Sequence, residues 1–486
     1  MRIPHFTKYL MFTAALGTFS LTACEDFLDI NQSPNSVLTP PTNNLLVAAE
    51  SDLGFLMGSD VHRYSSIFVQ QFAGQGGLVQ TVDYDRYTVT ATDMNNLWRT
   101  SIYADAQADM KKLIEQTQAT SPKYAGIAKI MQAFLFTVTT DAFGDIPFSQ
   151  ALQFEAQLQP AYDKSEDVYT GLITLINSGI DDIKKQSTLT PGSDDLLYGG
   201  DMLKWEKLAN ALKLRIYIHY YPKISATATT NINTLLTSGA PLMTSTADNF
   251  QMVFQALSNR TNPIDQFEPR RQNQFFPSAT LVDLMNSKAD PRRATYFTEF
   301  PAGQYTGVVN GTGTVVSTSF SRMHTYLRGA RTGTGVQDYA GDAPIRMLTF
   351  AEQNLILAEF YQRTGNTAQA TKFLTDGVQA SLSMASVPAA NATTYLATLP
   401  AQIAAKGLLR TIIEEKFIAN YGVAVEPWSD WRRTKFPAIT PSVGATLPAI
   451  PRILPYSDLE RVTNPNTPAR SSSDLTKPQV FWDPGA

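Results

Sequence analysis

Between Lys123 and Leu152 the chain carries its clearest periodic pattern of apolar and polar positions. Apolar residues recur there at the spacing of one face of an α-helix. They are Ile127, Ile130, Met131, Phe134 and Val138. Gly144 then allows the backbone to leave the helix, and Pro147 disfavours a helical conformation in the residue before it. The pattern predicts a buried helix that ends near Gly144.

The same helical period recurs along much of the remaining chain. It predicts helices at 40–57, 61–72, 95–117, 167–185, 201–221, 231–242, 278–286 and 402–421. Residues 78–92 are expected to form a loop or a short strand. Residues 249 to about 346 are rich in Gly, Thr, Ser and Asn and, apart from 278–286, are expected to be irregular. Irregular segments of this length within a compact protein commonly carry function.

Residues 350–383 have the spacing of a tetratricopeptide helix pair. The positions that carry it are Leu357, Ala358, Tyr361, Gly365, Ala370, Leu374 and Gly377. Asn366 or Thr367 is suited to cap the second helix of the pair. The chain is therefore predicted to be mostly α, built from helix pairs, with a loop-rich, irregular half.

Composition narrows the class of protein. The 486 residues are 43% hydrophobic and 17% charged, which is typical of a globular protein. The formal net charge of −4 leaves no basic surface of the kind that binds nucleic acid. A single cysteine excludes an intrachain disulfide and a cysteine-rich metal site.

The N-terminus has the features of an export signal. Residues 9–22 form an apolar run that is too short to span a bilayer. Leu-Thr-Ala then precedes Cys24, an order that resembles the bacterial lipobox, where the cysteine becomes lipidated. A chance cysteine after an ordinary signal peptide is the alternative. We expect a signal peptide at 1–23, a lipidated tether at 24–41 and a single domain at 42–486.

Enzymatic motifs are not apparent in the sequence. His62, His219 and His324 are isolated, without a paired metal-ligand spacing, and no Gly-x-Ser-x-Gly elbow occurs. A glycosidase needs two carboxylates facing each other across its substrate. The adjacent acids of this chain are expected on solvated faces instead; they are Asp181-Asp182, Asp194-Asp195 and Glu414-Glu415. We expect no catalytic residue, no metal site and no cofactor.

Two other groups of polar residues have a structural interpretation that we favour over a functional one. Asp141 and Asp145 flank the turn at Gly144, where a carboxylate usually accepts hydrogen bonds from backbone amides. Arg432 and Arg433, beside two tryptophans, could clamp a ligand. We expect them instead to hold the C-terminal segment through buried ion pairs and ring packing.

Sugar recognition uses flat rings and planar polar groups, and the irregular segments contain both. We hypothesise that Tyr84 and Tyr87 provide stacking surfaces for a ligand. Polar residues nearby or on the later irregular segments would bond its hydroxyls or a carboxylate. These candidates are Asp83, Arg86, Asn262, Arg270 with its neighbour Arg271, and Arg346.

Several motifs in order make the chain resemble the SusD/RagB family of outer-membrane nutrient-binding lipoproteins, and most closely its SusD-like subgroup. The motifs include Cys24-Glu25-Asp26-Phe27-Leu28-Asp29, Asp141-Ala142-Phe143-Gly144-Asp145-Ile146-Pro147, Lys204-Trp205, Asp290-Pro291-Arg292, Trp431-Arg432-Arg433-Thr434, Ile450-Pro451-Arg452 and Phe481-Trp482-Asp483. Each motif is weak alone, but together they cover essentially the whole chain.

The resemblance implies about four tetratricopeptide-like helix pairs and an irregular half that carries the ligand surface. It implies a lipid anchor in the outer membrane, and acidic residues just after Cys24 resemble a signal for the cell surface. It also implies a SusC-like TonB-dependent barrel as partner, over which the protein sits as a lid. Such proteins bind glycans, or in some members peptides, and catalyse nothing.

Two other functions remain open at this level. One is a lipid-anchored glycan hydrolase, and the other is a purely structural subunit of the transporter complex. Calcium is seen in some relatives, but no Asp-x-Asp-x-Asp-Gly loop occurs in this chain.

Overall fold

The computed structural model describes residues 40–75, 80–313 and 317–485. Contacts within the chain divide it into two units, Met1–Pro41 and Thr42–Ala486. The fold described below is that of the second unit. The expected signal peptide, the lipidation site and nearly all of the tether lie outside the described residues.

Helices dominate this unit, as the sequence predicts. Those of the first half are α2 (Thr42–Met57), α3 (Asp60–Phe68), α4 (Gln80–Asp85), η2 (Asn96–Gln107), α5 (Ala108–Thr117), α6 (Pro122–Phe143), α7 (Ser165–Ile183), α8 (Met202–His219) and α9 (Ser225–Thr237). Those of the second half are α10 (Pro263–Arg270), α11 (Ala279–Ser287), α12 (Arg293–Tyr296), α13 (Thr325–Arg328), α14 (Phe350–Arg363), α15 (Thr367–Met384), α16 (Ala389–Leu396), α17 (Leu399–Lys406), α18 (Leu408–Ala419), α19 (Glu426–Thr434) and α20 (Asp458–Thr463). The element η2 is a π-helix, and short 3₁₀ turns are η1 (Thr92–Met94), η3 (Phe154–Ala156), η4 (Thr246–Asp248), η5 (Ser317–Ser319) and η6 (Ser472–Thr476).

The central helix α6 is buried along nearly its whole length. It begins with Pro122, whose fixed φ suits the first helical position. It ends at Gly144, where φ is +79°, a value that favours glycine. The buried helix predicted from the apolar period, and its end, are therefore confirmed.

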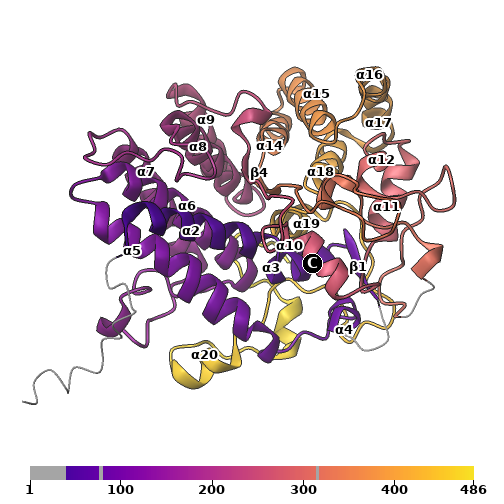
Figure 1. Cartoon of the computed structure of the whole chain (residues 1–486). Coiled ribbons are helices and arrows are strands. Elements are labelled where there is room, and N and C mark those ends of the chain that lie inside the picture. The colour runs from indigo at the N-terminus through magenta and orange to yellow at the C-terminus, as the bar shows by residue number, and fades with distance from the viewer. Residues whose placement is uncertain (1–39, 76–79, 314–316, 486) are drawn as a thin grey trace, which may run out of the picture. The chain divides into compact units, whose positions relative to one another are not determined.

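Helix pairs form the scaffold, with α6–α9 in one group and α14–α18 in another (Figure 1). Within the predicted pair α14–α15, the Asn366 side chain accepts the Gln369 amide at 3.2 Å and so caps α15. Helices α6 and α7 approach closely because glycines meet at their contact. A Cβ on Gly126 would lie 2.7 Å from the carbonyl oxygen of Gly179.

Four short strands form two antiparallel pairs. Strand β1 (Phe72–Gly74) pairs with β3 (Phe275–Pro277), and β2 (Phe250–Met252) pairs with β4 (Ile345–Leu348). Each pair joins segments that lie far apart in the sequence. The β1–β3 pair joins the irregular 249–346 region to the segment after α3, and the β2–β4 pair brings the two ends of that region together.

Several predicted elements differ from the structure. The 249–346 region, expected to be irregular apart from 278–286, also contains α10, α12 and α13. Residues 80–85, expected as loop or strand, form α4, because four of its six residues are buried against β1 and α3. The predicted helix at 402–421 is two helices, α17 and α18, because Gly407 has φ of +85°. Helix α9 begins six residues earlier than the pattern indicates.

The prediction that the adjacent acids lie on solvated faces is wrong for Asp182, Asp195, Glu414 and Glu415, which are all buried, whereas Asp181 is exposed as expected. Glu415, for example, accepts Lys288 Nζ at 2.8 Å and Arg292 Nη2 at 2.6 Å. Burial alone would raise the pKa of Glu415, but these two cations lower it to about 2. These acids hold the scaffold together through ion pairs and hydrogen bonds.

Arg432 and the tryptophans hold the C-terminal segment as the sequence predicts, but Arg433 does not, because its ion pairs are with Glu359 on α14 and Asp430 on α19. Trp428 Nε1 donates to the Pro451 carbonyl at 2.9 Å, and Arg432 donates to the Arg452 carbonyl at 2.8 Å. Asp145 accepts the Ser165 amide at 2.9 Å and so starts α7. All are structural contacts, as expected.

The Asp141 carboxylate was expected to accept hydrogen bonds from backbone amides, but the structure differs. It accepts the Tyr169 hydroxyl at 2.5 Å and Trp482 Nε1 at 3.3 Å, both side-chain donors. It therefore ties α6 to α7 and to the C-terminal segment.

Among the described residues, no helix is sufficiently long and apolar to cross a membrane, and no cluster of three or more His, Cys, Asp or Glu could hold a metal ion.

Candidate ligand-binding site

A polar hollow of about 480 Å³ opens where α10 meets the ends of α2, α3, α4 and η2. We call it the polar hollow. Its lining consists of Phe55, Ser59, Asp60, Arg63, Tyr64, Gln80, Thr81, Tyr84, Asp93, Asn96, Pro263, Gln266, Phe267, Arg270 and Arg271. Tyr84, Arg270 and Arg271, expected from the sequence, are thus brought together.

Tyr84 lines the hollow but is almost fully buried. The side chain is 4% exposed, and its ring centroid lies 4.6 Å from that of Tyr64. The Tyr64 hydroxyl donates to the Tyr84 hydroxyl at 3.0 Å, which in turn donates to Asp93 at 3.2 Å. Burial raises the pKa of Tyr84, so its hydroxyl stays protonated and keeps its hydrogen bond to Asp93.

Three guanidinium groups line the same hollow. Arg63 is ion-paired with Asp60 and lies 4.6 Å above the Phe267 ring, which fixes its plane. Arg270 and Arg271, at the end of α10, are exposed and form no ion pair with any residue that the structure describes. Free guanidinium groups can donate paired hydrogen bonds to vicinal hydroxyls or to a carboxylate.

Phe55 separates the polar hollow from a more apolar one of about 520 Å³ and lines both. We call the second one the Phe55 hollow. Its lining also includes Met252, Val253 and Phe254, and Phe254 meets Phe55 edge-on at 5.3 Å. Phe55 is 36% exposed, so a flat apolar surface adjoins the polar groups.

Tyr87, expected to stack on a ligand, is not at the surface. It is 1% exposed, its ring packs against Phe68 at 6.1 Å, and its hydroxyl accepts the Ser442 amide at 2.9 Å. Although it lies only three residues after Tyr84, the end of α4 turns it inward. A ring buried in this way cannot stack on a ligand, which was the role expected for Tyr87 from the sequence.

Arg86 and Arg346 also lie outside the hollow. Arg86 Nε donates to the Gly311 carbonyl at 2.9 Å and joins α4 to the later irregular segment. Arg346 is buried, with its guanidinium 3.8 Å from the Tyr326 ring centroid. Both residues position loops and neither lines the polar hollow or the Phe55 hollow.

Asn262 is fully buried and caps α10, accepting the Ile264 amide at 2.7 Å. The Asn-Pro order before α10 is a helix-start signal that could have indicated this role. Asp83 is exposed but does not line the hollow. These two expected ligands therefore do not join the polar hollow.

Phe55, Arg63, Asn96 and Gln266 line the polar hollow but were not expected from the sequence. The first three lie on helices predicted as scaffold. No sequence motif near these residues indicates that they line the hollow, because they come together only through the packing of α2, α3 and η2.

This fold is a tetratricopeptide-like helical scaffold with an irregular region, and an open, partly aromatic hollow lies where α10 of that region meets the first helices of the scaffold. The chain belongs to the SusD-like family, whose model is described as "Starch-binding associating with outer membrane" and matches residues 34–456. The resemblance found in the sequence is thereby confirmed, together with membership of a family associated with the outer membrane.

Solved structures share the fold at low sequence identity. A SusD/RagB family protein from Bacteroides thetaiotaomicron is 22% identical, with a TM-score of 0.77 over 92% of this chain and 100% of that one. A chitin-binding protein is 22% identical, with a TM-score of 0.74 over 91% and 100%. A chitin-binding SusD homolog from Flavobacterium johnsoniae is 20% identical, with a TM-score of 0.74 over 91% and 98%. No curated protein sequence matches this chain.

Proposed function

We propose that this protein is a lipid-anchored, cell-surface receptor of the outer membrane that captures an oligosaccharide in the polar hollow. It hands the ligand to a SusC-like TonB-dependent barrel and acts as the lid of that barrel. The observation that carries the proposal is the polar hollow itself, which joins the Phe55 ring to the guanidinium groups of Arg270 and Arg271 and to side-chain amides on a SusD-like scaffold.

The chemistry of the hollow supports a glycan. A pyranose ring has an apolar C–H face that packs on an aromatic ring, while its rim of hydroxyls needs planar donors and acceptors. Phe55 provides the ring, and Arg270, Asn96 and Gln266 provide the planar groups. Two relatives of this fold are named for chitin, so chito-oligosaccharides are the first ligands to test.

The carboxylates that line the polar hollow favour ligand binding without hydrolysis. The carboxylates in the lining are Asp60, ion-paired with Arg63, and Asp93, which accepts the Thr90 amide at 2.8 Å and the Tyr84 hydroxyl. Both are engaged in contacts within the protein. A glycosidase would need two carboxylates free to flank the scissile bond.

Transfer to a barrel would follow from closure of the lid. A bound glycan drives closure only as far as it binds the closed state more tightly than the open state. Exposed groups such as Arg270 are suited to contact the ligand more closely in the closed state. Arg270 has no ion pair with any described residue that would have to break first.

The proposal is tested by affinity electrophoresis of the mature protein in gels that contain chitin derivatives, starch or other polysaccharides, followed by calorimetry with the oligosaccharide that binds. Retardation without release of reducing ends supports a receptor. Release of reducing ends would identify a hydrolase, and no retardation across the panel would leave a structural subunit.

Arg270→Ala is expected to weaken glycan binding about tenfold, because a charge-assisted hydrogen bond of roughly 1.5 kcal/mol is lost. Calorimetry with the retarded oligosaccharide measures the change. Lys223→Ala, which removes the same charge from an exposed turn away from both hollows, is the matched control. Equal affinities of both variants and the unchanged protein would remove the polar hollow as the binding site.

A further inference from the structure

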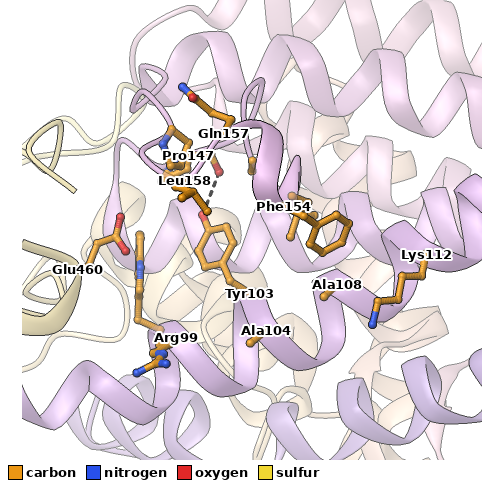
Figure 2. Close-up of a pocket in the computed structure, with 14 residues that line it drawn as sticks. Arg99, Tyr103, Ala104, Ala108, Lys112, Pro147, Phe154, Gln157, Leu158 and Glu460 are labelled. Carbon is orange, nitrogen blue, oxygen red and sulfur yellow. Dashed lines mark hydrogen bonds between the residues drawn. The ribbon is translucent and has the colours of Figure 1, made fainter. Parts of the chain in front are cut away.

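A third hollow, of about 480 Å³, lies along η2 and α5, apart from the two hollows described above. We call it the η2 hollow. The residues that shape it are Trp98 and, labelled in Figure 2, Tyr103, Ala104, Ala108, Phe154 and Leu158. Its volume is in the range of small-ligand sites, which are mostly apolar with a few polar groups.

Aromatic side chains form part of the wall of the η2 hollow. Tyr103 stands at the centre, held by a 2.9 Å hydrogen bond from its hydroxyl to the Pro147 carbonyl (Figure 2). Trp98 packs beside it, with ring centroids 5.1 Å apart. Ala104 and Ala108 carry no side chain beyond Cβ, so they leave a slot between Tyr103 and Phe154.

Phe154 lies at the surface, although exposing an apolar phenyl ring to water is energetically unfavourable. It is 43% exposed, and Leu158 four residues later is 79% exposed. Both Leu152 and Phe154 have positive φ, of 59° and 50°, which is uncommon for non-glycine residues. The loop thus keeps an apolar wall open beside the slot.

Polar groups with unused bonding capacity stand at the rim. Arg99 is exposed and has no ion-pair partner in the described part of the chain. Glu460 receives the Tyr162 and Asn464 donors on Oε1 alone, which leaves Oε2. Gln157 uses its amide N–H groups on Gln150 and Gln159, which leaves its carbonyl oxygen.

We infer that the η2 hollow is a second saccharide-binding site, which takes one sugar ring of a glycan between Tyr103 and Phe154. The C–H face of the ring would pack on these side chains, and Arg99, Glu460 and Gln157 would meet its hydroxyls. This inference rests on the proposed function, because it assumes that the ligand is a glycan. It adds a site that no expectation from the sequence includes.

Trp98 provides a specific reporter for this site. It is one of five tryptophans in the chain, and neither the polar hollow nor the Phe55 hollow has a tryptophan in its lining. The other four are buried elsewhere; they are Trp205, Trp428, Trp431 and Trp482. In protein labelled with 5-fluorotryptophan, the ¹⁹F signal of Trp98 can be assigned from its absence in Trp98→Phe.

The experiment titrates the labelled protein with chitohexaose and, separately, with maltoheptaose, and follows ¹⁹F signals and calorimetric heat in parallel. We expect the Trp98 signal to shift in a saturable way. Phe154→Ala is expected to raise the Kd from this signal about fivefold or more, since an aromatic contact is lost. Ala104→Leu, which fills the slot from an exposed position, is expected to abolish the shift.

Arg270→Ala separates the two sites, because it is expected to weaken the main calorimetric binding and leave the Trp98 shift unchanged. Leu203→Ala, an exposed leucine on α8 outside all three hollows, is the control. Calorimetric binding with a Trp98 signal that does not move would overturn the second site and leave the proposed function intact. Absence of any binding, by either readout and across the glycan panel, would overturn both.

Discussion

Asp52 illustrates how one residue in this fold works against stability. It lies on α2 near Asp105 and Asp109, and no hydrogen bond or ion pair is formed by its side chain within the described residues. Burial, and then the charges of Asp109 and Asp105, raise the pKa of Asp52 to about 6. Because the folded pKa lies above the usual value of 3.8, ionised Asp52 costs stability at neutral pH.

We expect Asp52→Asn to raise the free energy of unfolding at pH 8 by about 1 kcal/mol, a figure reduced for the partial exposure of the site. The contribution of neutral Asp52 is complete below pH 3.8 and is lost as the pH rises through about 6. The gain should therefore shrink between pH 6 and pH 4. Urea unfolding at several pH values measures it, with Asp181→Asn on α7 as the control. A gain that is the same at pH 4 and pH 8 would contradict this explanation.

At the scale of elements, the contact between α6 and α7 depends on close approach. Gly126 and Gly179 allow the two helices to meet backbone to backbone, and the carbonyl of Gly179 faces the position where a Cβ on Gly126 would lie. The periodicity of α6 indicates which face is buried. Its neighbour on the side of Gly126 is α7.

Gly126→Ala is expected to destabilise the protein by about 1–3 kcal/mol, although alanine is the better helix former. The added Cβ would lie 2.7 Å from the Gly179 carbonyl oxygen and 2.8 Å from the Ile183 nitrogen, and neither backbone atom can move alone. Thermal unfolding measures the effect. Gly192→Ala, where only one atom lies as near as 4.0 Å, should change little. If both substitutions have the same effect, close helix packing is not the reason.

The elements also differ in how well local pattern predicts them. Helices with strong caps, such as α15 with Asn366, are confirmed close to their predicted bounds. Helix α4 was missed because its six residues have no helical period of their own and are stabilised by burial against β1 and α3. A short element of this kind is decided by tertiary contacts.

Across the whole molecule, the C-terminal segment joins parts of the scaffold that are distant in the sequence. Trp482 is fully buried, its Nε1 donates to the Tyr169 hydroxyl at 2.7 Å, and its ring lies 5.1 Å from that of His219. The Arg432 guanidinium lies 4.9 Å from the same ring. One side chain thus connects α7, α8 and α19.

Trp482→Ala is expected to lower the free energy of unfolding by about 3–5 kcal/mol, because a large cavity opens and the Tyr169 and Asp141 contacts are lost. Chemical unfolding followed by circular dichroism measures the loss. Val462→Ala, also in the C-terminal region but 84% exposed, should remain within about 0.5 kcal/mol of the unchanged protein. A loss below 1 kcal/mol for Trp482→Ala would mean that the C-terminal segment is not part of the cooperative fold.

The sequence by itself determined the helical class, most helix positions and the family, because these depend on local periodicity, caps and ordered motifs. It also singled out Tyr84 and Arg270, which line the polar hollow. Only the tertiary structure decided that Tyr87 is buried and that Phe55 and Arg63 join the hollow. The physical reason is that a hollow is formed by helices distant in sequence, and which face each residue takes depends on the segments that pack against it.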